Sequence, residues 1–312
     1  MISFAPIQGF TDLVYRKAFS ETFTGVDTFF IPYISLKNGV LPAKYLKEVL
    51  PENNPQHKVV PQVLPGDGNE MTELAKILRD LNYNEINLNL GCPYPMVTRR
   101  GRGAGLLPFP EKIRAILSEF FDKTDMKLSV KFRSGLVSEK ETEPLIGVLN
   151  RFPLTEIIFH PRVASQMYGG EINNELFQQV AQTSQHRVVY NGDLISESVF
   201  RKKQELFPAT TDWMLGRGIL MNPFLPAEIS GIYFSPEKKL EKLEAFHQRV
   251  FELYSEKMDN AGNVLNKMIQ FWIYFSFVFP RQPKVFKIIK KTKDIAGLKK
   301  NVQGIFQSGI SG

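Results

Sequence analysis

Eight short apolar or β-branched segments recur along the first two thirds of the chain, and most of the intervals between them are long enough for a helix. Intervals such as 69–81 and 110–121 carry apolar residues three and four positions apart, which predicts amphipathic helices. Strands that alternate with helices pair in parallel, and eight such units predict a closed (β/α)8 barrel, the TIM barrel. The eight segments are ISFA (2–5), DTFFIPY (27–33), KVVPQVL (58–64), EINLN (85–89), LSVKF (128–132), EIIFH (156–160), RVVYN (187–191) and DWMLG (212–216).

The pattern changes after the eighth segment. Ser235-Pro236 is typical of a helix N-cap followed by proline in the first turn, and apolar residues three and four positions apart come after it. Two further helical segments are expected at 264–279 and 284–300, separated by a stretch with two prolines. We therefore predict an α/β barrel domain over 1–234 and a small all-α helical domain over 235–312.

The composition excludes several classes of protein. With 43% apolar and 23% charged residues among 312, the chain is typical of a soluble globular protein. It has no signal-peptide pattern and no apolar run of about 18 residues, so we expect a cytoplasmic protein without a membrane span. The single cysteine, Cys92, excludes an internal disulfide. We expect no metal site, because the four histidines are scattered at positions 57, 160, 186 and 247.

The positive charge of the chain is concentrated near its end. The net charge is +7, and residues 281–300 contain eight Lys or Arg and a single Asp. Such a cluster favours a polyanionic partner such as a nucleic acid. A solvated helix face that binds nothing is an equally good explanation of this run alone.

In a barrel of parallel strands, catalytic groups gather at the carboxyl ends of the strands. Seven of the eight segments end in polar residues or glycines, each of which has an ordinary explanation as a turn or core residue. Together they predict one polar site at the barrel mouth. The glycines after the last two strands, with Arg217, favour a phosphorylated cofactor. In chain order these residues are Gln8; Gln62; Asn89 and Cys92; Lys131 and Arg133; His160 and Arg162; Asn191, Gly192 and Asp193; and Gly216, Arg217 and Gly218.

The stretch NLGCP at 89–93, followed by a segment rich in glycine and arginine, resembles the signature of the tRNA-dihydrouridine synthases. Further stretches match the family in the same order, including HPRVASQMYGG at 160–170. The resemblance implies an FMN-binding TIM barrel with a C-terminal helical domain. It also implies that NADPH is the reductant and that the D-loop of tRNA carries the uridine to be reduced. We expect the protein to act as a monomer.

The resemblance also implies roles for individual residues. Reduction of the C5=C6 bond of uracil needs a hydride and a proton, and Cys92 occupies the place of the family's proton donor. An ordinary thiol, with a pKa of about 8.5, is protonated at neutral pH and suits this role. A buried, inert cysteine is the alternative. The implied flavin contacts are Pro6, Ile7, Gln8, Gln62, Lys131, His160, Asn191, Gly192, Asp193, Gly216 and Arg217.

Six further residues are expected to contact the uracil or the rest of the tRNA: Asn89, Arg99, Arg133, Arg162, Lys267 and Tyr274. Lys267 and Tyr274 are seven positions apart and so share one helical face, where they would suit a phosphate and a base. An ordinary amphipathic helix explains the same spacing. The segment KMIQFWIY at 267–274 resembles the subfamily that acts on tRNA position 16.

Two other functions fit the same sequence features. The first is a different FMN barrel oxidoreductase that reduces a free pyrimidine or an enone. The second is a non-catalytic barrel that binds RNA through its basic surface. The chain also departs from the family, because Tyr94-Pro95 stands where members commonly carry a basic residue after Cys-Pro, which puts a basic contact from this position in doubt.

Overall fold

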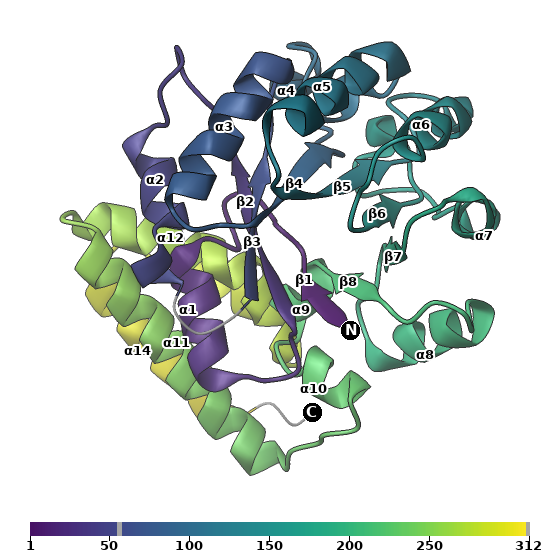
Figure 1. Cartoon of the computed structure of the whole chain (residues 1–312). Helices are drawn as coiled ribbons and strands as arrows, with labels where there is room; N and C mark the ends of the chain where they lie inside the picture. Colours follow the sequence, from purple (N-terminus) through teal and green to yellow (C-terminus); the bar gives the residue numbers. More distant parts are fainter. Residues whose placement is uncertain (55–57, 310–312) are drawn as a thin grey trace.

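The computed structural model describes residues 1–54 and 58–309, and it contains a closed barrel of eight parallel strands in chain order (Figure 1). The barrel closes where β1 pairs in parallel with β8, with Ile2 opposite Trp213. The predicted (β/α)8 barrel is confirmed. The strands are β1 (Ile2–Phe4), β2 (Thr28–Ile34), β3 (Lys58–Val63), β4 (Glu85–Leu90), β5 (Lys127–Arg133), β6 (Ile157–His160), β7 (Val188–Asn191) and β8 (Trp213–Leu215).

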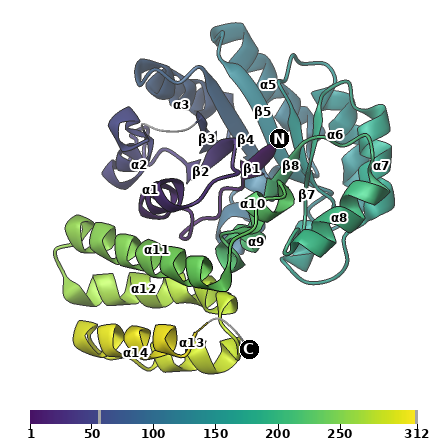
Figure 2. The ribbon, with the colours of Figure 1, turned by 90° about the horizontal axis from the view of Figure 1, so that it is seen from below.

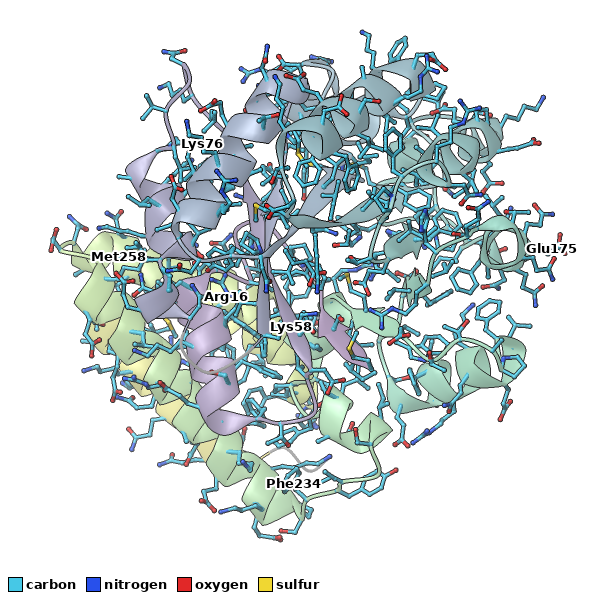
Figure 3. The ribbon with its side chains drawn as sticks, in the orientation of Figure 1. Arg16, Lys58, Lys76, Glu175, Phe234 and Met258 are labelled. Atoms are coloured by element: carbon cyan, nitrogen blue, oxygen red, sulfur yellow. The ribbon has the colours of Figure 1, made fainter. Side chains whose placement is uncertain are left out.

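The connecting helices form a ring outside the strands and turn charged side chains such as Lys76 and Glu175 to solvent (Figure 3). Several begin at an Asp, Asn or Ser whose side chain accepts a hydrogen bond from the first turn, as Asp67 does for α3. The helices are α1 (Leu13–Thr22), α2 (Ala43–Val49), α3 (Gly68–Asp80), α4 (Pro95–Thr98), α5 (Pro110–Lys123), α6 (Thr142–Leu149), α7 (Asn174–Thr183), α8 (Glu197–Leu206), α9 (Arg217–Met221) and α10 (Leu225–Ile229).

Four helices follow the barrel and lie against one side of it (Figure 2). The prediction of one helical segment over 284–300 is wrong, because the chain turns within it. The Asp294 side chain accepts a hydrogen bond from the Gly297 N–H and starts a new helix there. The four helices are α11 (Pro236–Lys257), α12 (Ala261–Phe275), α13 (Gln282–Lys290) and α14 (Ile295–Gln307).

Aromatic packing joins α11 to the barrel. The ring of Phe246 on α11 lies 5.4 Å from that of Tyr15 on α1 and 5.1 Å from that of Phe23, centroid to centroid. Phe246 is fully buried, and one hydrophobic core runs from the barrel helices into α11 and α12. Burial of such large rings holds the helical region rigidly on the barrel.

Two negative findings apply to residues 1–54 and 58–309. None of their helices is long and apolar enough to cross a membrane. They also contain no group of three or more His, Cys, Asp or Glu side chains placed to hold a metal ion.

Candidate active site

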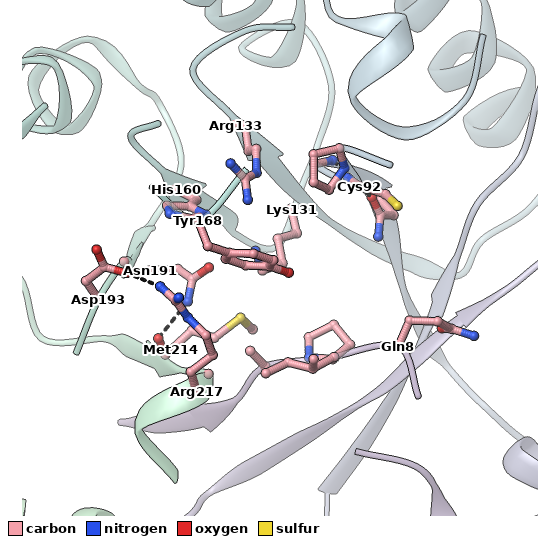
Figure 4. A pocket seen from close by; sticks show the side chains of 18 of the residues that line it. Gln8, Cys92, Lys131, Arg133, His160, Tyr168, Asn191, Asp193, Met214 and Arg217 are labelled. Carbon is pink, nitrogen blue, oxygen red and sulfur yellow. Dashed lines mark hydrogen bonds and ion pairs between the residues drawn. The ribbon is translucent and has the colours of Figure 1, made fainter. Parts of the chain in front are cut away.

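One cavity opens at the carboxyl ends of the barrel strands, and residues at the end of every strand line it (Figure 4). Cys92 and Lys131 both line this cavity. The sequence-predicted residues in its lining are Pro6, Ile7, Gln8, Gln62, Asn89, Cys92, Lys131, Arg133, His160, Asn191, Gly192, Asp193, Gly216, Arg217 and Gly218.

Lys131 is an unpaired cation at the centre of the site. Within the described part of the chain, no hydrogen bond or ion pair reaches its ammonium group. Burial, with a smaller contribution from the nearby Arg133 charge, lowers the pKa of Lys131 to about 7. A group that loses this much hydration without gaining a partner is a strong site for an anionic ligand.

His160 lies beside Lys131 as a neutral ring. Burial and the charges of Arg133, Lys131, Arg162 and Arg217 hold the pKa of His160 well below its ordinary value. Its Nε2 atom is buried and has no hydrogen-bond partner among the described residues. A ring nitrogen without a partner, on a side chain that lines a cavity, is available to bond a ligand there.

A chain of buried side chains inside the barrel leads to Cys92. Asn87 Nδ2 donates to Ser129 Oγ at 2.8 Å, and Gln62 Nε2 donates to Asn87 Oδ1 at 2.8 Å. Asn89 Nδ2 donates to Gln62 Oε1 at 2.6 Å, while Asn89 Oδ1 accepts the Cys92 N–H at 2.8 Å. Asn89 therefore fixes the turn that carries the cysteine.

The loop after α4 closes over Cys92. Gly103 has a φ of +56°, and a Cβ there would lie 3.0 Å from the Cys92 Cβ, so glycine permits this close approach. The Ala104 N–H donates to the Cys92 carbonyl at 3.2 Å. Arg102 anchors the same loop by donating to the Leu64 carbonyl and to Glu70, each at 2.8 Å.

Cys92 is only 7% exposed and still forms part of the cavity wall. Burial raises its pKa, and the Tyr94 backbone, the Tyr33 hydroxyl and the Arg133 charge each oppose that rise. The thiol is therefore protonated at neutral pH. This state suits a proton donor and does not suit a nucleophilic thiolate.

The loops after β7 and β8 meet on the opposite side of the cavity. A Cβ at Gly218 would lie 2.0 Å from the Leu194 carbonyl oxygen, so only glycine allows this contact. Asp193 has a φ of +44°, and its carboxylate accepts from Arg217 at 2.5 Å and from Arg162 at 2.6 Å. The Asp193 carboxylate would repel a negatively charged phosphate. Its contribution to a phosphate site is therefore to hold the Arg217 guanidinium in place.

Four predicted residues lie outside the cavity lining. Arg162 has a side chain only 1% exposed, and it donates to Asp193 and to the Gly170 carbonyl, so it supports the loops from behind. Arg99 is exposed at the end of α4. Lys267 donates to Asp12 and to the Gly9 carbonyl, each at 3.2 Å, and Tyr274 packs edge-on against Phe10. Lys267 and Tyr274 each have a contact within the protein, and their role as a pair that contacts tRNA stays a prediction.

Three aromatic residues of the lining, Tyr33, Tyr94 and Tyr168, were not predicted as site residues. Tyr168 lies within the matched stretch 160–170, and the Arg217 and Arg133 guanidinium groups lie 4.6 and 5.5 Å from its ring centroid. Tyr33 lies in the second strand segment, where a nearly continuous apolar run gave no sign of a polar role.

The comparison with family sequences decides which kind of barrel this is. A sequence model described as "Dihydrouridine synthase (Dus)" matches residues 3–307. The chain belongs to the dihydrouridine synthase family. It is therefore an oxidoreductase, and the resemblance seen in the NLGCP stretch is confirmed.

Individual relatives agree with this family. The chain is 22% identical over 310 residues to the tRNA-dihydrouridine(16) synthase of Cupriavidus necator, covering 96% of each protein. It is 26% identical over 237 residues to the tRNA-dihydrouridine(16) synthase of Pseudomonas syringae pv. tomato, covering 73% of this chain and 74% of that protein. Among solved structures, the old yellow enzyme homologue from Zymomonas mobilis is similar in fold. Its TM-score is 0.55 at 9% identity, with 76% of this chain and 94% of that one covered.

Proposed function

We propose that this dihydrouridine synthase reduces the C5=C6 bond of a D-loop uridine in tRNA, using FMN and NADPH, with Cys92 as the proton donor. The observation that carries the proposal is the single cavity in which a protonated thiol and an unpaired lysine line the same barrel mouth. The (16) in the names of two relatives supports position 16 as the target.

The residues of the cavity fit a flavin mononucleotide. Lys131 and His160 have polar atoms without partners, which suits the electron-rich edge of a flavin ring. Gly192, Gly216 and Arg217 offer backbone N–H groups and a guanidinium for the phosphate. The flavin would supply hydride transfer, with NADPH as the source of its electrons.

Cys92 and its neighbours would handle the proton. The thiol gives its proton to C5 of the uracil, and water restores it from solvent after each turnover. Arg133 lies in the same cavity, where burial lowers its pKa to about 10 and leaves it charged at neutral pH. That charge suits a uracil carbonyl oxygen and helps to stabilise the negative charge left on the sulfur.

Binding of tRNA would combine a flipped base with contacts to phosphate. The uridine must leave its stack to reach the barrel mouth. Arg99 at the end of α4 and the lysines of 281–300 are exposed and suit the phosphates. One monomer contains the whole cavity, and we propose that it acts alone in the cytoplasm, where its substrate is found.

The direct test is to incubate the purified protein with FMN, NADPH and an unmodified tRNA transcript. Dihydrouridine is then quantified and mapped by mass spectrometry. We expect dihydrouridine in the D-loop at position 16, and no turnover of free uridine. Reduction of free uridine or of an enone at the same rate would favour the alternative flavin oxidoreductase. A colourless protein that releases no flavin would contradict the proposal.

A further inference from the structure

The loop between β1 and α1 (residues 5–12) forms one wall of the main cavity. Pro6, Ile7 and Gln8 line the cavity from this loop. A Cβ at Gly216, on the side proposed for the phosphate, would lie 3.6 Å from Ile7 Cδ1, so the loop also borders that side. Residues 5–12 contain neither helix nor strand, and their shape therefore depends on the contacts around them.

The helix α12 contacts this loop from outside the barrel, where the C-terminal helices lie beside α1 (Figure 2). Lys267 Nζ donates to the Gly9 carbonyl oxygen at 3.2 Å. Gly9 has a φ of +86°, and a Cβ there would lie 3.1 Å from Gln270 Nε2, so glycine lets α12 approach closely. The ring of Phe10 packs edge-on against that of Tyr274, with 4.9 Å between centroids. These contacts fall on loop residues that directly follow the cavity wall in sequence.

Asp12, at the end of the loop, connects it to two of the C-terminal helices. Its carboxylate accepts from the Tyr254 hydroxyl on α11, 3.0 Å from each oxygen, and from Lys267 Nζ on α12 at 3.2 Å. It also accepts the Tyr15 N–H at 3.2 Å and so caps α1. Tyr254 is buried and the Asp12 side chain is only 15% exposed, which favours strong charge-assisted hydrogen bonds.

We propose that Tyr254 and Lys267 are positioning residues for the flavin site: through Asp12 and the Gly9 carbonyl they fix the loop that forms one wall of that site. The C-terminal helices then serve cofactor binding in addition to any contact with tRNA. This inference rests on the proposed function, because it requires that the cavity binds FMN. It does not depend on whether Lys267 also contacts tRNA, since flavin binding is measured without tRNA.

The physical reason for this role is preorganisation. A loop that is free to move must be ordered when the flavin binds, and this ordering costs conformational entropy. Bonds that order the loop beforehand place that cost in the folding of the protein and leave the binding step stronger. Burial raises the pKa of Tyr254 well above its ordinary value, so its O–H remains a donor to Asp12 at neutral pH.

The test is the dissociation constant of FMN, measured by the change in flavin fluorescence on the flavin-free full-length chain. Tyr254→Phe removes the hydroxyl and keeps the ring, while Lys267→Met removes the cation from a side chain that is 25% exposed. We expect each change to raise Kd by about three- to tenfold. Lys267→Arg keeps a charged donor and should bind FMN much more tightly than Lys267→Met does.

Arg249→Met is the matched control. Arg249 on α11 pairs with Glu21 near the far end of α1, with 2.6 Å between Nε and Oε2. The change therefore also removes a contact between α11 and α1, but one that does not touch the loop. Its Kd for FMN should equal that of the wild type, which a general loosening of the C-terminal helices would not produce.

A double-mutant cycle tests whether Tyr254 acts through Asp12. Asp12→Ser keeps a residue that caps helices well, while its shorter side chain leaves the Tyr254 hydroxyl without this partner. If both residues act through one carboxylate, Tyr254→Phe should have no further effect on Kd in the Asp12→Ser protein.

A Kd equal to that of the wild type in both Tyr254→Phe and Lys267→Met would overturn the inference. An effect of Tyr254→Phe that persists undiminished in Asp12→Ser would also overturn it. A wild type that binds no FMN would overturn the proposed function, and this inference with it. The two failures are distinguishable, because the first is seen only beside a wild type that binds FMN.

Discussion

The side-chain oxygen of Asn89 accepts a hydrogen bond from the backbone N–H of Cys92 over 2.8 Å. Asn89 also donates to Gln62 at 2.6 Å and stands opposite Lys131 in the register of β4 and β5. The buried Asn89 side chain therefore fixes the turn that carries Cys92, while its backbone lies opposite Lys131 on the neighbouring strand β5. The spacing of the two groups depends on rigid strands, which hold such geometry better than loops do.

We expect Asn89→Ala to loosen the Cys92 turn. A displacement of a catalytic group by about 1 Å costs on the order of a hundredfold in rate, so kcat for dihydrouridine formation should fall by about that factor. Iodoacetamide should alkylate Cys92 faster at a fixed pH, because the turn opens to solvent. Unchanged kcat together with unchanged alkylation would show that Asn89 does not hold the turn.

Lys131 predicts an unusual dependence of stability on pH in the flavin-free protein. Its pKa falls from 10.5 to about 7 on folding, so between these values the unfolded chain binds more protons and stability rises with pH. The charged lysine therefore opposes folding at and below neutral pH. Lys131→Met should raise Tm at about pH 6, and the gain should shrink as the pH approaches about 10. A gain that is constant with pH would contradict this assignment.

The same substitution should weaken flavin binding. Lys131→Met removes the cation that suits the electron-rich edge of the ring, so the purified protein should retain less flavin or accept electrons from NADPH more slowly. Absorbance of bound flavin and the rate of its bleaching by NADPH measure the two effects. Lys127→Met, at the exposed start of the same strand, is the matched control. Wild-type behaviour of Lys131→Met in both assays would rule out the proposed role.

The basic surface of α13 should bind tRNA phosphates. Lys287, Lys290 and Lys291 are exposed, and none forms an ion pair with a described residue. Changing all three to Gln should weaken tRNA binding and reduce the slope of log affinity against log salt by about 0.7 to 0.9 for each phosphate that a lysine no longer neutralises. Oxidation of NADPH without tRNA should stay unchanged. Equal affinity and equal slope would mean that this surface is only solvated.

We expect Phe246 to be essential for packing the C-terminal helices against the barrel. It fills a buried space between Tyr15, Phe23 and Phe271. Phe246→Ala should lower the free energy of unfolding by about 3–5 kcal/mol, as large-to-small changes in cores do. Urea unfolding measures this loss. Phe277→Ala, at an exposed position, is the control and should change stability little. Separate unfolding of the two parts in the wild type would contradict a shared core.

The fold was largely predictable because each strand is a compact run of buried residues. The run KVVPQVL, for example, predicts β3 within one residue of its observed end at Val63. The turn at Asp294 was not predictable from the pattern, since lysines and apolar residues continue through it at helical spacing. The side-chain cap on the Gly297 N–H, which ends that continuity, is visible only in the structure.

The site residues were predictable where a residue's position on its strand alone determines the direction of its side chain. Lys131 and His160 lie at or near the ends of their strands and line the cavity as expected. Arg162 follows a strand in the same way, yet it turns inward because Asp193, 31 positions away in sequence, attracts it. Tyr33 was missed because its place in the lining comes from packing on a cluster that includes Leu64 and Cys92, which belong to other parts of the barrel. Contacts of this kind depend on the closed barrel and leave no local signal.

The most direct test of the account is the rate of dihydrouridine formation in tRNA by Cys92→Ala beside the wild type, with bound flavin measured in both. We predict that Cys92→Ala binds flavin and tRNA as the wild type does, while its product formation falls by about 10²- to 10⁴-fold, as expected for loss of a general acid. A Cys92→Ala protein that makes dihydrouridine at the wild-type rate would contradict the central claim that this thiol donates the proton.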